Sequence, residues 1–264
     1  RSLGQNFLIS DQVIQRILMA VEKTKCDSLV EVGPGLGALT DGLFALGLPL
    51  TLIELDQKFA SYWRNRAVSE NKIVRIHEVD ALKLDWDELQ LSGKVTFVSN
   101  LPYQISSSIV IVRSVLPAGI SAMVLMFQKE VAQRIMAKPH SKDYGMLTVI
   151  AQCFWKIETV TDAGPKDFFP PPNVASRVLK FEAKEIKTIA PNERESFLSF
   201  VKAAFAQRRK LMIKNLSAGG KISGTTAESH ATLERAMTAM NLSLQARAEE
   251  LSPEQFIDLF RRVN

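Results

Sequence analysis

The run Glu-Val-Gly-Pro-Gly-Leu-Gly at residues 31–37 follows an apolar segment, 29–32, that predicts a strand, and a helical pattern comes after it. Glycines at a strand-to-helix turn let backbone N–H groups approach a ligand closely. Glu54 ends the next predicted strand, 21 residues after Gly33, and a ribose-binding carboxylate is expected at a spacing of about 20. Gly33, Gly35 and Glu54 therefore predict a site for a nucleoside-containing cofactor.

The glycine spacing separates two classes of cofactor. The run reads G-x-G-x-G, and Ala38 stands where a dinucleotide-binding fold often has its third glycine. A nicotinamide dinucleotide enzyme is therefore disfavoured. On the glycines alone, a turn with a purely structural role stays open as the alternative.

Strands and helices alternate from residue 28 onward, which predicts an α/β fold with a parallel, doubly wound, Rossmann-like sheet. A further helix over 14–21 is expected before the first strand, capped by Ser10 or Asp11. Of two later strand-like runs, 157–161 and 176–182, the second is expected to form an edge or hairpin strand. The other strands are predicted over 29–32, 50–53, 73–79, 95–99 and 122–127, and the helices over 39–46, from 57, over 105–116 and 130–137, and after 145.

The character of the chain changes at residue 190, which predicts a domain boundary. Beyond it we find helical periodicity without strand signals, so we expect residues 1–190 to form the sheet domain and 191–264 a smaller all-α domain. The small, glycine-rich stretch 217–226 predicts a loop between two helices of the second domain.

Asn100-Leu101-Pro102-Tyr103 ends a predicted strand and carries a chemical signal. An amino group conjugated to an aromatic ring is a poor nucleophile, so an enzyme that alkylates it needs fixed acceptors that orient the amine. The Asn100 amide oxygen and a turn carbonyl held by Pro102 are such acceptors, and Tyr103 offers a flat face for an extruded base. The alternative is a plain turn in which Asn100 caps a helix that begins near Ser106.

Asp80 follows the third predicted strand and is a candidate acceptor for a cofactor amine, or else a turn cap. Glu54, Asp80 and Asn100 all stand at the ends of successive strands. In an open α/β sheet these ends meet in the crevice where ligands bind. We therefore expect the three side chains to line one site.

Composition excludes several other classes of protein. No apolar run reaches the roughly 18 residues of a membrane span, and no signal-peptide pattern opens the printed sequence. Two distant cysteines, Cys26 and Cys153, suit free thiols in a reducing compartment. The three scattered histidines, His77, His140 and His230, give no recognisable metal site. We expect a cytoplasmic protein with no metal and no membrane partner.

A net charge of +5 favours a polyanionic partner, and the positive excess lies towards the end of the chain. Residues 191–264 carry 11 Lys and Arg against 8 Asp and Glu. Arg208, Arg209 and Lys210, with Lys214 one helical turn further, form the best candidate for phosphate binding. The alternative is a solvated helix face.

Two phenylalanines, Phe168 and Phe169, open a rigid proline loop. Either ring is a candidate for a second stacking surface opposite Tyr103, and the alternative is an aromatic plug on the core.

These motifs, in this order, resemble the S-adenosylmethionine-dependent adenine-N6 methyltransferases. Within that class the chain closely resembles the KsgA-type adenine dimethyltransferases of small-subunit ribosomal RNA, over its entire length. The further segments that carry the resemblance are Leu3-Gly-Gln-Asn-Phe-Leu8, Gln128-Lys-Glu-Val131, Tyr144-Gly145, Phe168-Phe-Pro-Pro-Pro172, Phe205-Ala-Gln-Arg-Arg-Lys210 and Arg247-Ala-Glu-Glu-Leu-Ser252.

The resemblance implies that S-adenosylmethionine is the cofactor and that Phe168 is the second stacking ring. It implies methylation of two adjacent adenosines near the 3′ end of small-subunit ribosomal RNA to N6,N6-dimethyladenosine. The expected partners are the small ribosomal subunit and its RNA, bound by a monomer. The residues that would touch the cofactor are Asn6, Leu8, Gly33, Glu54, Asp80 and Asn100.

The sequence departs from the family pattern at two positions. Asn173 stands where many relatives have Lys, within Asn-Val-Ala-Ser rather than Lys-Val-Asp-Ser, and Gln104 replaces a common Asn. Both changes bear on how the RNA or the target base is seated. Two rivals stay open: an Erm-type enzyme acting on large-subunit RNA, and a ribosome-assembly factor in which methyl transfer is secondary.

Overall fold

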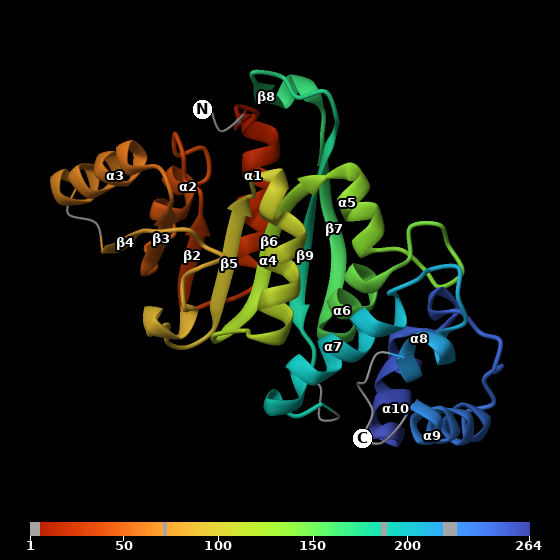
Figure 1. The fold of residues 1–264 in the computed structure, drawn as a ribbon. Helices are drawn as coiled ribbons and strands as arrows, with labels where there is room; N and C mark the ends of the chain where they lie inside the picture. Colours follow the sequence, from red (N-terminus) through yellow and green to blue (C-terminus); the bar gives the residue numbers. More distant parts are fainter. Residues whose placement is uncertain (1–5, 71–72, 186–188, 219–225) are drawn as a thin grey trace. The chain divides into compact units, whose positions relative to one another are not determined.

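The computed structural model describes residues 6–70, 73–185, 189–218 and 226–264, and the chain divides into two compact units (Figure 1). Unit 1 comprises residues 1–109, 117–132 and 156–183, and unit 2 comprises 110–116, 133–155 and 184–264. This division is not the single cut that we predicted at residue 190. In unit 2, helix α6 (Met146–Phe154) packs with two C-terminal helices, α7 (Arg194–Ala204) and α10 (Pro253–Val263), and chain order does not reveal that packing.

The larger sheet has seven strands in the order β4-β3-β2-β5-β6-β9-β7. This is an α/β arrangement of the doubly wound kind, as predicted. Strands β2 to β6 pair in parallel. The order reverses between β2 and β5, which lie side by side although two strands separate them in the chain. The parallel strands are β2 (Ser28–Val32), β3 (Leu50–Glu54), β4 (Val74–Glu78), β5 (Val95–Asn100) and β6 (Ile120–Gln128).

The strand predicted over 176–182 is β9 (Ser176–Ala183), and its predicted place at an edge is wrong. It lies between β6, to which it is antiparallel, and β7 (Trp155–Ala163), so the hairpin alternative is the correct one. The proline run before this strand had left an edge open. Lys180 is 8% exposed, because its Nζ lies 2.8 Å from Glu158 Oε1 on β7.

Side chains of helices α1, α2 and α3 pack with side chains of the strands in one apolar cluster of unit 1. Ser10 is the N-cap residue of α1, but its side chain makes no capping hydrogen bond. Later in the chain, α4 follows β5 and α5 follows β6, as predicted (Figure 1). Their bounds are α1 (Asp11–Glu22), α2 (Thr40–Ala45), α3 (Gln57–Ser69), α4 (Tyr103–Val115) and α5 (Lys129–Ile135).

Two short strands were not predicted: β1 (Phe7–Leu8) and β8 (Phe168–Phe169), which pair antiparallel. Phe7 pairs with Phe169 and Leu8 with Phe168. This pairing joins the start of the described chain to the proline loop.

Unit 2 is built around aromatic side chains. Phe197 lies 5.3 Å from Phe260 between ring centroids, and Phe205 stacks on Phe256 at 5.7 Å. Most of the predicted loop 217–226 lies outside the described residues. The helices of unit 2 include α6, α7, α8 (Met212–Ala218), α9 (Thr226–Ala239) and α10. Short 3-10 turns occur at Trp86–Leu89 and Pro165–Asp167 in unit 1, and at Pro191–Glu193 and Ala248–Glu250 in unit 2.

Candidate active site

The glycine run at 33–37 forms the turn after β2 as predicted, and side chains of α3 hold it in place. Gly35 and Gly37 have φ angles of +51° and +93°, which side-chain-bearing residues rarely adopt. A Cβ at Gly37 would lie 2.6 Å from the Trp63 ring, and Trp63 Nε1 donates to the Gly35 carbonyl at 3.0 Å. The turn is thus a rigid strip of backbone at the carboxyl end of β2.

Glu54, at the end of β3, contacts this turn directly. Its Oε2 accepts a hydrogen bond from the Gly35 amide at 3.3 Å and its Oε1 one from the Asp56 amide at 2.9 Å. Burial raises the pKa of the Glu54 carboxyl above its ordinary value, while the two backbone hydrogen bonds oppose the shift. The spacing of 21 residues therefore does bring Glu54 and Gly35 together.

A second buried acid, Glu31, lies just before the glycines, and the sequence analysis gave it no role. It is 2% exposed, and its Oε2 accepts a hydrogen bond from the Thr40 hydroxyl at 2.8 Å. Burial raises the pKa of Glu31 to about 8; the Thr40 hydrogen bond opposes the shift, and the nearby carboxylates of Glu54 and Asp41 add to it. A charged residue inside an otherwise apolar strand was the signal that could have identified it.

Asn100 and Pro102 follow β5, on the other side of the point where the strand order reverses. Asn100 Nδ2 donates to the Asn6 carbonyl at 3.4 Å, and Pro102 Cδ is the atom nearest to the space beside Gly33, at 4.0 Å from an ideal Cβ there. The structure thus brings Asn100, Pro102 and the glycine turn together in unit 1.

The alternative role of Asn100 as a helix cap does not fit. Helix α4 begins at Tyr103 rather than near Ser106, so Asn100 lies outside the capping position. The Pro102 carbonyl accepts a hydrogen bond from the Ile105 amide at 3.1 Å and so belongs to the helix start. The carbonyl that Pro102 holds in position ahead of the helix is that of Leu101.

Tyr103 is half-buried, and its hydroxyl lies 3.2 Å from the Ser176 hydroxyl at the start of β9. The predicted partner ring, Phe168, is only 2% exposed and packs in the core, as the alternative of an aromatic plug requires. Its neighbour Phe169 is 69% exposed. Because side chains alternate along a strand, β8 buries one ring and presents the other. In this structure the ring available to solvent is that of Phe169.

Asp80 lies directly after β4 and caps a turn. Its Oδ1 accepts a hydrogen bond from the Leu82 amide at 2.9 Å, as the capping alternative requires. One carboxylate oxygen is used in this way, so the cap and a ligand role are compatible.

The first described residues cover the glycine turn. The Phe7 ring comes within 3.4 Å of the place that a Cβ at Gly35 would occupy, and it meets Phe59 edge-to-face. Asn6 contributes its carbonyl to Asn100, whereas the Leu8 side chain is 3% exposed and belongs to the core. Phe7 was missed by sequence reasoning, because no local pattern marks it.

The basic residues Arg208, Arg209 and Lys210 are all exposed, but the alternative of a solvated helix face does not fit them. They lie in a turn between α7 and α8, and only Lys214 is helical. Arg208 is also paired, because its Nε lies 2.5 Å from Glu249 Oε2.

Among the described residues, no group of three or more His, Cys, Asp and Glu side chains is arranged to hold a metal ion. Cys26 and Cys153 are free thiols. In the described part of the chain, no helix has the length and apolar character needed to cross a membrane.

The doubly wound sheet, with a glycine turn and acids at the carboxyl ends of its strands, defines the class of Rossmann-like S-adenosylmethionine-dependent methyltransferases. The sequence model of the family described as "Ribosomal RNA adenine dimethylase" matches residues 1–264. The chain belongs to this family, and the enzyme class and cofactor predicted from its sequence are confirmed.

Curated relatives agree over nearly the whole length. A "Ribosomal RNA small subunit methyltransferase A" of Bdellovibrio bacteriovorus is 54% identical, over 99% of this chain and 91% of the relative. One of the same name from Natranaerobius thermophilus is 35% identical, over 100% and 91%.

Solved structures share the fold. A dimethyladenosine transferase from Plasmodium falciparum superposes with a TM-score of 0.73 at 22% identity, covering 96% of this chain and 95% of the other. The 23S rRNA methyltransferase ErmE superposes with a TM-score of 0.68 at 23% identity, covering 98% and 99%. At these identities the likeness shows the fold alone, so shape does not separate the small-subunit enzyme from its Erm-type rival.

Proposed function

We propose that this enzyme methylates N6 of two adjacent adenosines near the 3′ end of small-subunit ribosomal RNA, giving N6,N6-dimethyladenosine during maturation of the subunit. The observation that carries the proposal is the meeting of Asn100 and Pro102 with the glycine turn at Gly33, where the strand order reverses. Such a switch point is where open α/β sheets bind ligands. A methyl donor and an amine acceptor would meet there.

The residues around the turn fit S-adenosylmethionine. Its ribose hydroxyls are donors suited to the Glu54 carboxylate, which is 4% exposed and receives hydrogen bonds from two backbone amides. Asp80 would accept from the adenine amine, and Gly33 and Gly35 would let the backbone approach closely. When bound, this cofactor supplies the electrophilic methyl group. The contacts of Asn6 and Leu8 would be made through their backbone, since the Leu8 side chain is in the core.

Asn100 and Leu101 would orient the target amine. The Asn100 Nδ2 is turned to the Asn6 carbonyl, which leaves the amide oxygen as the acceptor for an N6 hydrogen. The Leu101 carbonyl, fixed by Pro102, would accept the other. No strong base is needed, because N6 becomes acidic as it attacks and its proton can pass to water. Positioning and preorganised acceptors would supply most of the rate enhancement.

Tyr103 would hold the extruded adenine by stacking. For the opposite face of the base, the family resemblance favours Phe168, whereas exposure favours Phe169. Stacking on Phe168 would require its ring to leave the core on RNA binding, so the two candidates can be distinguished experimentally.

Residues 191–264 would recognise the RNA and the particle, with Arg209, Lys210 and Lys214 as phosphate contacts, while residues 1–190 carry the transfer chemistry. We propose that the enzyme works as a monomer in the cytoplasm. The free thiols Cys26 and Cys153 suit that compartment.

The names of the relatives support the small subunit over the Erm-type alternative, at up to 54% identity. The same names do not favour the other alternative, an assembly factor with secondary methyl transfer.

The deciding experiment is transfer of labelled methyl groups from S-adenosylmethionine to small subunits that lack the modification, followed by nucleoside analysis. We expect N6,N6-dimethyladenosine at two adjacent positions, and no label with Asn100→Ala. Label on large subunits instead would support the Erm-type enzyme, and particle binding without label would support the assembly factor.

A further inference from the structure

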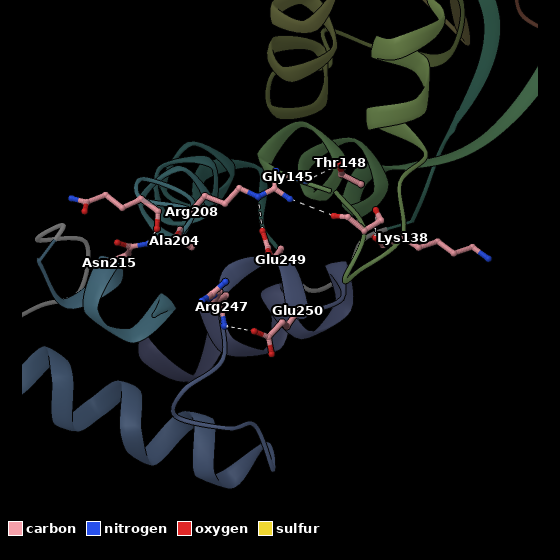
Figure 2. Close-up of polar contacts among 11 residues, drawn as sticks. Lys138, Gly145, Thr148, Ala204, Arg208, Asn215, Arg247, Glu249 and Glu250 are labelled. Carbon is pink, nitrogen blue, oxygen red and sulfur yellow. Dashed lines mark hydrogen bonds and ion pairs between the residues drawn. The ribbon is translucent and has the colours of Figure 1, made fainter. Parts of the chain in front are cut away.

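Three loops of unit 2 come together on one side of its helices. The α5 loop (138–145) follows α5, the α7 loop (205–211) joins α7 to α8, and the α10 loop (241–250) leads into α10. Figure 2 shows the Arg208 side chain of the α7 loop directed towards Glu249 of the α10 loop, with Lys138 and Gly145 labelled on the α5 loop.

Backbone hydrogen bonds fix the loops to one another. The His140 amide of the α5 loop donates to the Glu249 carbonyl of the α10 loop at 2.8 Å. The Met212 amide, directly after the α7 loop, donates to the Ala246 carbonyl at 3.0 Å. The α10 loop therefore binds both of the others.

The Arg208 side chain also links the three loops. Its Nε contacts Glu249 Oε2 at 2.5 Å, and its Nη2 donates to the Ser141 carbonyl at 3.4 Å (Figure 2). We call these three residues the Arg208 clasp. The guanidinium thus spans all three loops, and its charge is matched by the carboxylate beside it.

The base of the α7 loop is fixed separately. Asn215 is 7% exposed, and its Nδ2 donates to the carbonyls of Ala204 and Gln207 at 2.9 and 3.1 Å. The turn that carries Arg208 is therefore held both from α8 and from the clasp.

The three loops carry six Lys and Arg against three Asp and Glu. One of the acids, Glu249, is paired with Arg208 in the clasp. Lys142 follows Ser141 and Arg209 follows Arg208, so each of the two loops that the Arg208 clasp joins carries an exposed cation next to its clasp residue. A phosphate that approached Arg208 would also approach the Glu249 carboxylate, which would repel it.

We propose that Arg208 is a positioning residue, and that its pairing with Glu249 and Ser141 joins the α5, α7 and α10 loops into one surface on which Arg209, Lys210 and Lys142 bind RNA phosphates. This deepens the proposed function and rests on RNA being the substrate. Arg208 itself contributes no phosphate contact.

The salt dependence of binding to small-subunit particles tests the proposal. Log affinity falls linearly with log salt concentration, and each lost phosphate contact makes this slope shallower by about 0.7–0.9. The loss of affinity between 50 and 200 mM salt then becomes roughly threefold smaller. We expect that change for Arg209→Gln, the matched control in the same turn. The neutral pair Arg208→Gln/Glu249→Gln keeps the net charge and replaces the ion pair with two side-chain amides, which still donate to and accept from each other across the loops, so it should keep the wild-type slope. A slope lowered as in Arg209→Gln would overturn the proposal.

A charge exchange supplies a second, independent measurement. Arg208→Glu alone leaves two carboxylates facing each other, so we expect particle binding and the melting temperature to fall together. Arg208→Glu/Glu249→Arg restores the pair and should recover both. If the melting temperature recovers while binding stays at the level of the single variant, Arg208 contacts the RNA and the positioning role is refuted. If the exchanged pair does not fold, the neutral pair still decides.

Methyl transfer to particles by the wild-type enzyme separates this proposal from the proposed function. If methylation proceeds but Arg209→Gln, Lys210→Gln and Lys142→Gln all keep the wild-type slope, the surface is refuted and the function stands. If the wild-type enzyme does not methylate the particles, the proposed function itself fails.

Discussion

Replacing Glu31 by Gln should change how the stability of the enzyme depends on pH. Glu31 is buried beside the glycine turn with a pKa of about 8, against an ordinary value of 4.5 in the unfolded chain. Below pH 4.5 both states hold the proton. Between pH 4.5 and 8 the folded state keeps a proton that the unfolded state has released, so the free energy of unfolding falls as pH rises.

The size of the effect follows from the two pKa values. The interval from 4.5 to about 8, at 1.36 kcal/mol per pKa unit, corresponds to a loss on the order of 5 kcal/mol by pH 8. Gln has the shape of the protonated acid, and its amide oxygen can still accept the hydrogen bond from Thr40. The free energy of unfolding of Glu31→Gln should therefore not fall as pH rises from 4.5 to 8 through this group.

Urea unfolding at pH 5, 6, 7 and 8, followed by tryptophan fluorescence, measures the difference. We expect Glu31→Gln to gain roughly 3 to 4 kcal/mol on the wild type between pH 5 and 8, while the exposed control Glu88→Gln gains nothing. Wild-type and Glu31→Gln stabilities that run parallel with pH would refute the reasoning.

Three further outcomes are expected from the same site. Asn100→Ala should lose methyl transfer by on the order of a hundredfold or more with an unchanged melting temperature, and wild-type rates would rule out its role as acceptor. Glu54→Ala should weaken S-adenosylmethionine binding by roughly 1.5–3 kcal/mol in calorimetry, and an unchanged affinity would place the cofactor elsewhere. Phe168→Ala should destabilise the fold by about 3–5 kcal/mol, whereas Phe169→Ala should stay within about 0.5 kcal/mol. Of the two, the one whose loss raises KM for RNA beyond any stability effect is the stacking residue.

The central sheet could be predicted because its signals are local. Most of the parallel strands contain apolar runs, as in β3 or β6, and a glycine turn, an acid and a proline turn mark the ends of β2, β3 and β5. Glu54 and Gly35 were placed in one site from the spacing of the glycines and the acid, and the Gly35 amide does donate to Glu54.

The pairing of β1 with β8 could not be predicted, because strands of two residues have no periodicity. Without that pairing, the sequence cannot say which of Phe168 and Phe169 faces the core. The proline run before β9 could not separate an edge strand from a hairpin strand for a related reason, because that choice depends on which strands lie on either side of it.

The same limit applies to counting phosphate contacts from the basic residues of unit 2. If Arg208, Arg209, Lys210 and Lys214 all met phosphates, their joint contribution to the log–log salt slope would be about 2.8–3.6. Glu249 lies 41 residues from Arg208 in the chain, so no local pattern reveals that it neutralises this arginine. With Arg208 committed to the clasp, the contribution of the same four residues is about 2.1–2.7. These ranges do not overlap, so the slope lost when all four are neutralised together with Glu249 reports how many of these cations the fold leaves for the RNA.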